Sequence, residues 1–221
     1  RTSLPATASA IQPLDGSHLA LRWSGPPPAR RLARQPAQVI IRLPGQAPCQ
    51  RRPLSSNVRA HSATMLRVGL VSDTHGLLCP EVAEFLQGSL HIIHAGDICD
   101  LAILERLAAI APVTAVRGNN DRGAWAEQLA ESELIQLEGI FLYVVHDLAE
   151  IDIDPAGAGV HVVVSGHSHK PHVERRGPVL YVNPGSSGPR RFKLPIAAAE
   201  LLVEDGNVRA KVTEFLIHPA P

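Results

Sequence analysis

The sequence of 221 residues lacks any apolar run of about eighteen or more residues, although 45 % of its residues are hydrophobic. We therefore expect no membrane span and no membrane partner. Only three cysteines are present, Cys49, Cys79 and Cys99, and none of them forms a CxxC pair. This odd, sparse set argues against a disulfide framework and against a zinc knuckle, and it fits a reducing, cytoplasmic compartment.

The net charge of zero hides an asymmetry between two parts of the chain. Residues 1–64 contain nine arginines, no lysine and one acidic residue, so their net charge is +8, whereas residues 65–221 carry −8. Nine of the 19 prolines also lie in the first part. Such a composition offers too few apolar residues to bury a core. We expect 1–64 to be a disordered, Arg/Pro-rich extension and 65–221 to be the folded domain.

The single methionine, Met65, stands directly before the first expected strand of that domain. We therefore expect Met65 to be the natural start and the upstream piece to be a start-site extension. A functional basic tail and a targeting segment are the alternatives. The upstream piece has no regularly interleaved aromatic residues and no recognisable binding module, so we do not expect nucleic acid as a partner.

Apolar segments of strand length recur after residue 65, and each is followed by polar residues, most of them of metal-binding type. The polar residues that follow the six segments are Asp73, Thr74 and His75; Asp97; Asn119, Asn120 and Asp121; His146; His167, Ser168 and His169; and Asn183 with Ser186. Helix-like stretches at 80–89 and 101–110 separate the first three segments, which predicts βαβ units and a parallel sheet. Ligands bind beyond the carboxyl ends of such strands, the edge at which all of these candidates fall.

The part after residue 132 is rich in expected strands and turns. The strands are expected at 133–138, 140–146, 160–165, 178–183, 195–203 and 207–215, and glycine-containing turns separate some of them. The whole pattern predicts an α/β (α+β) fold in which two sheets pack face to face, with helices on the outside.

Aspartate and histidine two residues apart point to the same side of an extended chain, so Asp73 and His75 can share one ion, and His167 and His169 can meet at one place. Carboxylate, imidazole and amide ligands suit manganese, iron or zinc. Seven ligands are too many for one tetrahedral zinc, but they suit two ions that share a carboxylate, the arrangement that acts on phosphoryl centres. Each motif alone is weak evidence; their common placement after strands favours a metal site.

The motifs "SDTHG", "HAGD", "RGNND", "VVHD" and "SGHSH", in this order, resemble those of the calcineurin-like metallophosphoesterase superfamily. The short length and the closing "VNPGSS" are similar to its small YfcE-like or MJ0936-like phosphodiesterase branch. The resemblance extends over residues 65–221. It implies a four-layer αββα fold, a two-sheet β-sandwich flanked by helices.

The resemblance also implies roles for individual residues. Asp73, His75 and His169 would hold one divalent ion, Asn119, His146 and His167 would hold the second, and Asp97 would bridge the two. Catalysis would depend on Asp97, Asn119 and His146, with a hydroxide between the ions attacking phosphorus in line, and Asp121 would orient its neighbours by hydrogen bonds. Manganese is the preferred ion, with zinc, iron(II) or nickel as alternatives. The expected partner is a small phosphoester, and a homo-oligomer is an open possibility.

Two departures from the family pattern bear on activity. Larger relatives have a histidine directly after the amide ligand, where this chain has Asn120. Small-branch relatives usually have Gly-His after the equivalent of His146, where this chain has Asp147 and Leu148. We hypothesise that Asp147 disfavours phosphate dianions and so favours diesters. The predicted activity is that of a metal-dependent phosphodiesterase, and a catalytically weak protein-interaction scaffold on the same fold is the alternative.

Four further residues have a weaker claim to a role in the site. Arg117 is favoured as an exposed residue at a strand end rather than as a phosphate contact, and Trp125 as a core residue rather than a stacking platform. His94 and His172 are candidates for supporting the ligands. The sequence identifies no substrate-binding residue.

Overall fold

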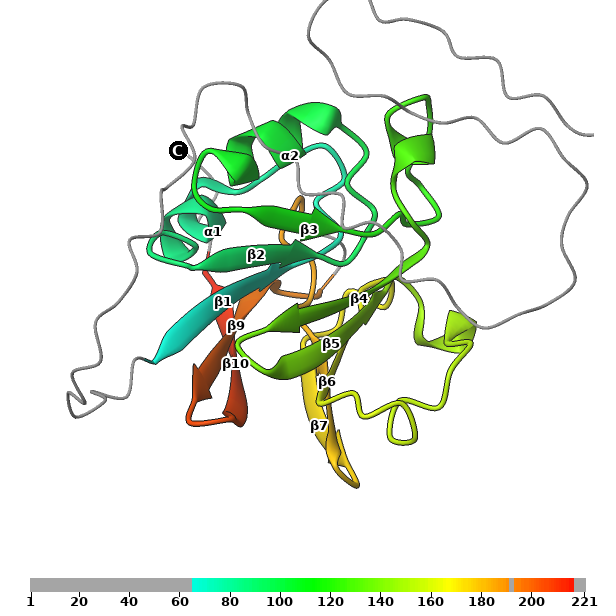
Figure 1. Cartoon of the computed structure of the whole chain (residues 1–221). Helices are drawn as coiled ribbons and strands as arrows, with labels where there is room; N and C mark the ends of the chain where they lie inside the picture. Colours follow the sequence, from blue (N-terminus) through cyan, green and yellow to red (C-terminus); the bar gives the residue numbers. More distant parts are fainter. Residues whose placement is uncertain (1–64, 191–192, 217–221) are drawn as a thin grey trace, which may run out of the picture. The chain divides into compact units, whose positions relative to one another are not determined.

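The computed structural model describes residues 65–190 and 193–216 (Figure 1). The extension expected at 1–64 lies outside the described residues. In chain order the elements are β1 (Leu66–Val71), α1 (Pro80–Phe85), β2 (His91–His94), α2 (Leu101–Ala108), β3 (Val113–Ala115), the 3-10 helix η1 (Ala126–Gln128), β4 (Ser132–Leu137), β5 (Ile140–Val145), the 3-10 helix η2 (Leu148–Glu150), β6 (Val162–Val164), β7 (His172–Arg176), β8 (Val179–Asn183), β9 (Ile196–Glu204) and β10 (Asn207–Phe215).

The strands of the described residues form two sheets, as the sequence predicted, and each sheet has five strands. The first sheet has the order β10-β9-β1-β2-β3, and the second has the order β4-β5-β6-β8-β7. The strands β1, β2 and β3 are parallel and are connected through α1 and α2, which confirms the predicted βαβ units. Parallel pairing also joins β5, β6 and β8, so the carboxyl ends of these strands lie at one edge of the second sheet.

Successive residues of the central strands point into two different cores. Leu70 and Ile93 pack between the two sheets together with Val144 and Val164 of the second sheet. Their chain neighbours, such as Val71, face the other side of the first sheet and pack against α1 and α2. This burial on both faces explains why apolar residues occur on both faces of these strands.

Different kinds of element pack on the outer faces of the two sheets. Figure 1 shows α1 and α2 on the same side of the first sheet. On the second sheet, the buried outer residues Tyr143 and Val163 pack against Ile151 and Ile153 of the segment that follows η2. Within the described residues this cover is therefore a loop with one 3-10 turn and not an α-helix. No helix in this part of the chain is long and apolar enough to cross a membrane.

Strand β7 is an element that the sequence analysis did not predict. All five of its residues are exposed, and it pairs antiparallel with β8 at the edge of the second sheet. Its sequence, HVERR, has none of the apolar alternation that identifies a strand. The guanidinium of Arg176 lies 4.6 Å from the ring centroid of Tyr181, a side-chain contact between β7 and β8.

Glu133 is a buried carboxylate in β4, only 6 % exposed, on the same face of the strand as the core residue Ile135. Burial raises the pKa of Glu133, because the charged form is disfavoured away from water. We expect Glu133→Gln to raise the free energy of unfolding at pH 7 by about 1 kcal/mol. The gain should disappear below the ordinary carboxyl pKa, where the folded and unfolded states both hold the proton. Urea unfolding at pH 4 and pH 7 measures both values.

The matched control is Glu131→Gln, two residues earlier. The Glu131 side chain is 77 % exposed and pairs with Arg117, and exposed ion pairs contribute little to stability. The control should leave the free energy of unfolding almost unchanged. A destabilised Glu133→Gln variant at pH 7 would contradict the prediction, because it would mean that the charged carboxylate is stabilising.

Candidate metal centre

The seven predicted ligands follow the carboxyl ends of five strands and converge at one edge of the two sheets. Asp73 and His75 follow β1, Asp97 follows β2, Asn119 follows β3, His146 follows β5, and His167 and His169 follow β6. Backbone hydrogen bonds tie these segments to one another. For example, the amide of Asp73 donates to the carbonyl of Gly96, and the amide of Gly166 donates to the carbonyl of His146.

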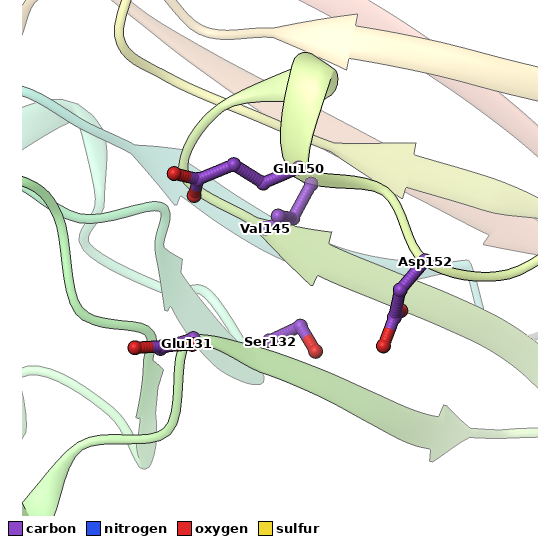
Figure 2. A pocket seen from close by; sticks show the side chains of 5 residues that line it. All are labelled: Glu131, Ser132, Val145, Glu150 and Asp152. Carbon is purple, nitrogen blue, oxygen red and sulfur yellow. The ribbon is translucent and has the colours of Figure 1, made fainter.

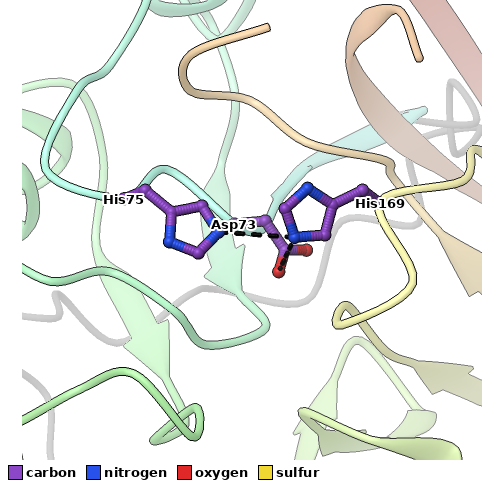
Figure 3. Close-up of side chains that lie close together, drawn as sticks. All are labelled: Asp73, His75 and His169. Atoms are coloured by element: carbon purple, nitrogen blue, oxygen red, sulfur yellow. Dashed lines mark hydrogen bonds and ion pairs between the residues drawn. The ribbon is translucent and has the colours of Figure 1, made fainter. Parts of the chain in front are cut away.

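The first cluster consists of Asp73, His75 and His169 (Figure 3). The Nε2 atoms of the two histidines are 3.3 Å apart, and Nε2 of His169 is also 3.3 Å from Oδ1 of Asp73. The two rings stack with their centroids 5.1 Å apart. Oδ1 of Asp73 is buried but has no hydrogen bond, which is unusual for a carboxylate oxygen. These ligand atoms therefore fit a divalent cation.

The second cluster is centred on the side-chain oxygen of Asn119. Oδ1 of Asn119 lies 3.0 Å from Nε2 of His146 and 3.1 Å from Nδ1 of His167. Nδ1 of His146 lies 2.7 Å from the carbonyl oxygen of Ala95, to which it can only donate. In the neutral ring the lone pair of His146 is then on Nε2, directed into the cluster, as metal binding requires.

Asp97 lies between the two clusters. Its Oδ1 is 3.5 Å from Nε2 of His146, and its Oδ2 is 3.8 Å from Nε2 of His75. Each of its two oxygens therefore faces a different cluster. The carboxylate is 2 % exposed, so it is held in this position away from bulk water.

The two buried carboxylates differ in their proton affinity. Burial and the negative charge of Asp97 together raise the pKa of Asp73 to about 6, against an opposing hydrogen bond from Ser72. Burial also raises the pKa of Asp97, but hydrogen bonds from Asn120 and the nearby His146 outweigh it and hold that pKa below its ordinary value. Two carboxylates this close to each other favour a cation between them.

The backbone at the site differs from the expectation that these residues are extended. Left-handed φ values occur at five of the seven candidates, which are Asp73 (53°), His75 (46°), Asp97 (57°), His167 (65°) and His169 (57°). Alternation along an extended strand therefore does not place the side chains of "DTH" and "HSH", although Asp73 and His75 do meet in one cluster as predicted. The tight turn after β6 instead sends His167 to Asn119 and His169 to Asp73. Such strained conformations are concentrated at functional sites.

Hydrogen bonds from two loop residues hold Asp97. The carboxylate of Asp121 accepts from the backbone amides of Asp97, Cys99 and Gly118 at 3.0, 2.7 and 2.7 Å. The sequence analysis selected Asp121 for such a role but assigned none to Asn120. The amide nitrogen and Nδ2 of Asn120 donate to the two oxygens of Asp97 at 2.8 and 2.6 Å. Only the position of Asn120 in the run "GNND" could have indicated this.

The four weaker candidates lie as follows. Arg117 pairs with an exposed glutamate, Trp125 packs beside the helices that cover the first sheet, and His172 is exposed in β7. Only His94 is in contact with the ligand loops, where its Nε2 lies 3.0 Å from Oγ1 of Thr74. Burial lowers the pKa of His94 to about 3, so this histidine is a neutral support of the loop.

A cavity of about 260 Å³ lies beside the second sheet and is distinct from the metal-ligand clusters. Figure 2 shows its lining residues, Glu131, Ser132, Val145, Glu150 and Asp152. Its charged side chains are all carboxylates. Because like charges repel, this cavity is a poor place for a phosphate group.

A face-to-face pair of sheets with imidazole, carboxylate and amide ligands gathered at one edge is an architecture for metal-dependent catalysis. The chain belongs to the calcineurin-like phosphoesterase superfamily, whose domain profile matches residues 66–206. It is 34 % identical over 156 residues to the probable metallophosphoesterase MJ0623 of Methanocaldococcus jannaschii. The matched region covers 64 % of this chain and 78 % of that protein.

Two further relatives agree with the small branch that the motifs indicated. The phosphodiesterase MJ0936 of Methanocaldococcus jannaschii is 25 % identical over 139 residues, covering 54 % of this chain and 83 % of that protein. Among solved structures, the phosphoesterase YfcE from E. coli superimposes with a TM-score of 0.51 at 25 % identity, covering 62 % of this chain and 91 % of that one. The predicted family and the predicted two-sheet fold are thus confirmed.

Proposed function

We propose that this protein is a phosphodiesterase that uses two divalent ions. Asp73, His75 and His169 would hold one ion, Asn119, His146 and His167 would hold the other, and Asp97 would be shared between them. The main support is the place of Asp97, whose two oxygens face the histidines of different clusters. The donor set of imidazole, carboxylate and amide favours manganese, with zinc, iron(II) or nickel as alternatives.

The chain's own groups have definite parts in the proposed reaction. When bound, the two ions supply a deprotonated water at neutral pH and neutralise charge on the phosphoryl oxygens. Because Oδ1 of Asn119 faces the two histidines, its Nδ2 is the donor left for a phosphoryl oxygen of the substrate. Asn120 keeps Asp97 in place, and the carbonyl of Ala95 fixes the orientation of His146.

The need of a leaving group for a proton separates the phosphoesters that this site can hydrolyse from those that it cannot. The residue after Asn119 is Asn120, whose amide is occupied by Asp97 and cannot give up a proton at neutral pH. The site then favours phosphoesters whose leaving groups need little protonation, such as aryl diesters. A small phosphoester is the proposed partner rather than nucleic acid. The small, odd number of cysteines in the sequence supports a cytoplasmic location.

The first experiment is hydrolysis of bis-p-nitrophenyl phosphate by the chelator-stripped full chain, with and without added Mn²⁺. We expect activity to appear with Mn²⁺ and His169→Ala to reduce kcat/KM by about 10³-fold or more, because the variant lacks a ligand of the first ion. The matched control is His172→Ala, an exposed histidine three residues further on, which should retain full activity.

The negative outcomes point to different conclusions. A chain that binds the metal but hydrolyses neither this diester nor p-nitrophenyl phosphate favours the alternative of an interaction scaffold. A chain that binds no metal contradicts the metal centre itself. Equal losses in His169→Ala and His172→Ala would mean that histidine substitution in this part of the chain acts through folding.

A further inference from the structure

The ring of His167 is the most exposed of the four candidate histidine rings, and its two nitrogens have different surroundings. Its side chain is 47 % exposed, compared with 2 % for His146. Nδ1 faces Oδ1 of Asn119 at 3.1 Å, the same oxygen that Nε2 of His146 approaches. Nδ1 is therefore the nitrogen on the side of the second ion, and Nε2 is the outer nitrogen.

The outer nitrogen of His167 faces a carboxylate. Oδ2 of Asp147 lies 3.6 Å from Nε2 of His167, slightly beyond hydrogen-bond distance but close enough for the carboxylate charge to attract an N–H at Nε2. The other oxygen of the same carboxylate, Oδ1, accepts a hydrogen bond of 3.0 Å from the amide of Ala149 and caps η2. This hydrogen bond holds the carboxylate in place. The Asp147 side chain therefore caps the turn with one oxygen and faces His167 with the other.

A negative charge at the outer nitrogen determines which nitrogen of His167 binds the ion. A carboxylate only accepts, so it favours the tautomer that has its proton on Nε2 and its lone pair on Nδ1. That lone pair is directed to Asn119 and the second ion. Carboxylates behind metal-binding histidines have this effect in general, and their loss typically costs 10–100-fold in metal affinity.

We propose that Asp147 is a positioning residue for the second ion, acting through His167. The inference rests on the proposed function, because it takes the second ion to lie between Asn119, His146 and His167. The exposed ligand of the second ion is thus held by a charge from the turn that follows β5.

The decisive variant is Asp147→Asn. Its Oδ1 can still cap η2, since asparagine is as good a cap as aspartate. Its Nδ2 would then face Nε2 of His167, which favours the opposite tautomer, with the proton on Nδ1 where the ion must bind. A second variant, Asp147→Ser, keeps a capping oxygen but has no group long enough to reach His167. We expect both variants to fold, because both preserve the cap.

The test is Mn²⁺ titration of the chelator-stripped full chain by calorimetry, with the bound ions counted by elemental analysis. We expect the unmodified chain to bind two ions, and both Asp147 variants to bind the second ion at least tenfold more weakly while the first ion is unaffected. The matched control is Glu150→Gln, which removes the same charge from an exposed residue of the same turn and should leave both affinities unchanged.

A spectroscopic measurement separates positioning from a merely structural role. In the metal-free chain, the ¹⁵N shifts of the His167 ring should place its proton on Nε2, and in Asp147→Asn on Nδ1. Variants that bind the second ion as tightly as the unmodified chain, or an unchanged tautomer in Asp147→Asn, would overturn the inference alone. An unmodified chain that binds fewer than two ions would overturn the proposed function and the inference with it.

Discussion

The Asp97→Asn variant is expected to lose both the second metal ion and at least about 10³-fold in kcat/KM. Two physical reasons add together. The variant removes the negative charge that faces both clusters. Its new amide group would also meet Asn120, because Asn120 donates to both oxygens of Asp97 and one donor would then oppose another. Bis-p-nitrophenyl phosphate hydrolysis with Mn²⁺ and a metal count measure the two losses.

The matched control for this variant is Asp100→Asn, in the same loop. The carboxylate of Asp100 caps α2 by accepting from the amide of Ala102, and asparagine caps a helix equally well. The control removes one negative charge near the site without changing a metal ligand, and it should retain activity and both ions. If Asp97→Asn keeps two ions and activity within tenfold of the unmodified chain, Asp97 is not the bridge.

Gly118→Ala is expected to be the most damaging substitution of a residue that contacts no ion. A Cβ at Gly118 would lie 2.2 Å from the amide nitrogen of Asp97 and 2.3 Å from its Oδ1, far inside contact distance. The backbones of both residues are fixed by hydrogen bonds to the same oxygen of Asp121, so neither can move freely. To avoid this clash, one of the two loops must shift by about 1 Å, and a displacement of that size can lower the rate of hydrolysis about 10²-fold. Overpacking should also lower the free energy of unfolding by about 3 kcal/mol.

Thermal unfolding with and without Mn²⁺ measures this effect, together with the metal count. The control is Gly206→Ala in the β9–β10 turn, where a Cβ meets no atom within 4 Å and φ is 76°. There the left-handed backbone costs alanine about 1–2 kcal/mol, and the metal centre should be intact. A Gly118→Ala chain that binds two ions and is no less stable than Gly206→Ala would show that the close approach of the two loops is not needed.

The larger part of the fold could be predicted because its physical cause is local. Strand β6, with the sequence VVV, is apolar on both faces since it is buried on both faces, and that composition is visible in the sequence. Strand β7 was missed for the opposite reason. Its residues are exposed, and it is a strand only because β8 offers it an edge to pair with.

By itself the sequence determined which residue types follow which strands, and therefore that ligands from several strands meet at one edge. Spacing alone did not determine how these ligands are shared between the two clusters, and the division of His167 and His169 between two ions came from the resemblance to the family. Spacing suggested that His167 and His169 act together, but a left-handed turn directs them to different clusters. The contacts of Asp97 with Asn120, and of Asp147 with His167, likewise join residues that lie about twenty positions apart. Only the tertiary structure determined these two contacts, because they depend on how different loops pack against each other and not on the order of residues within any one loop.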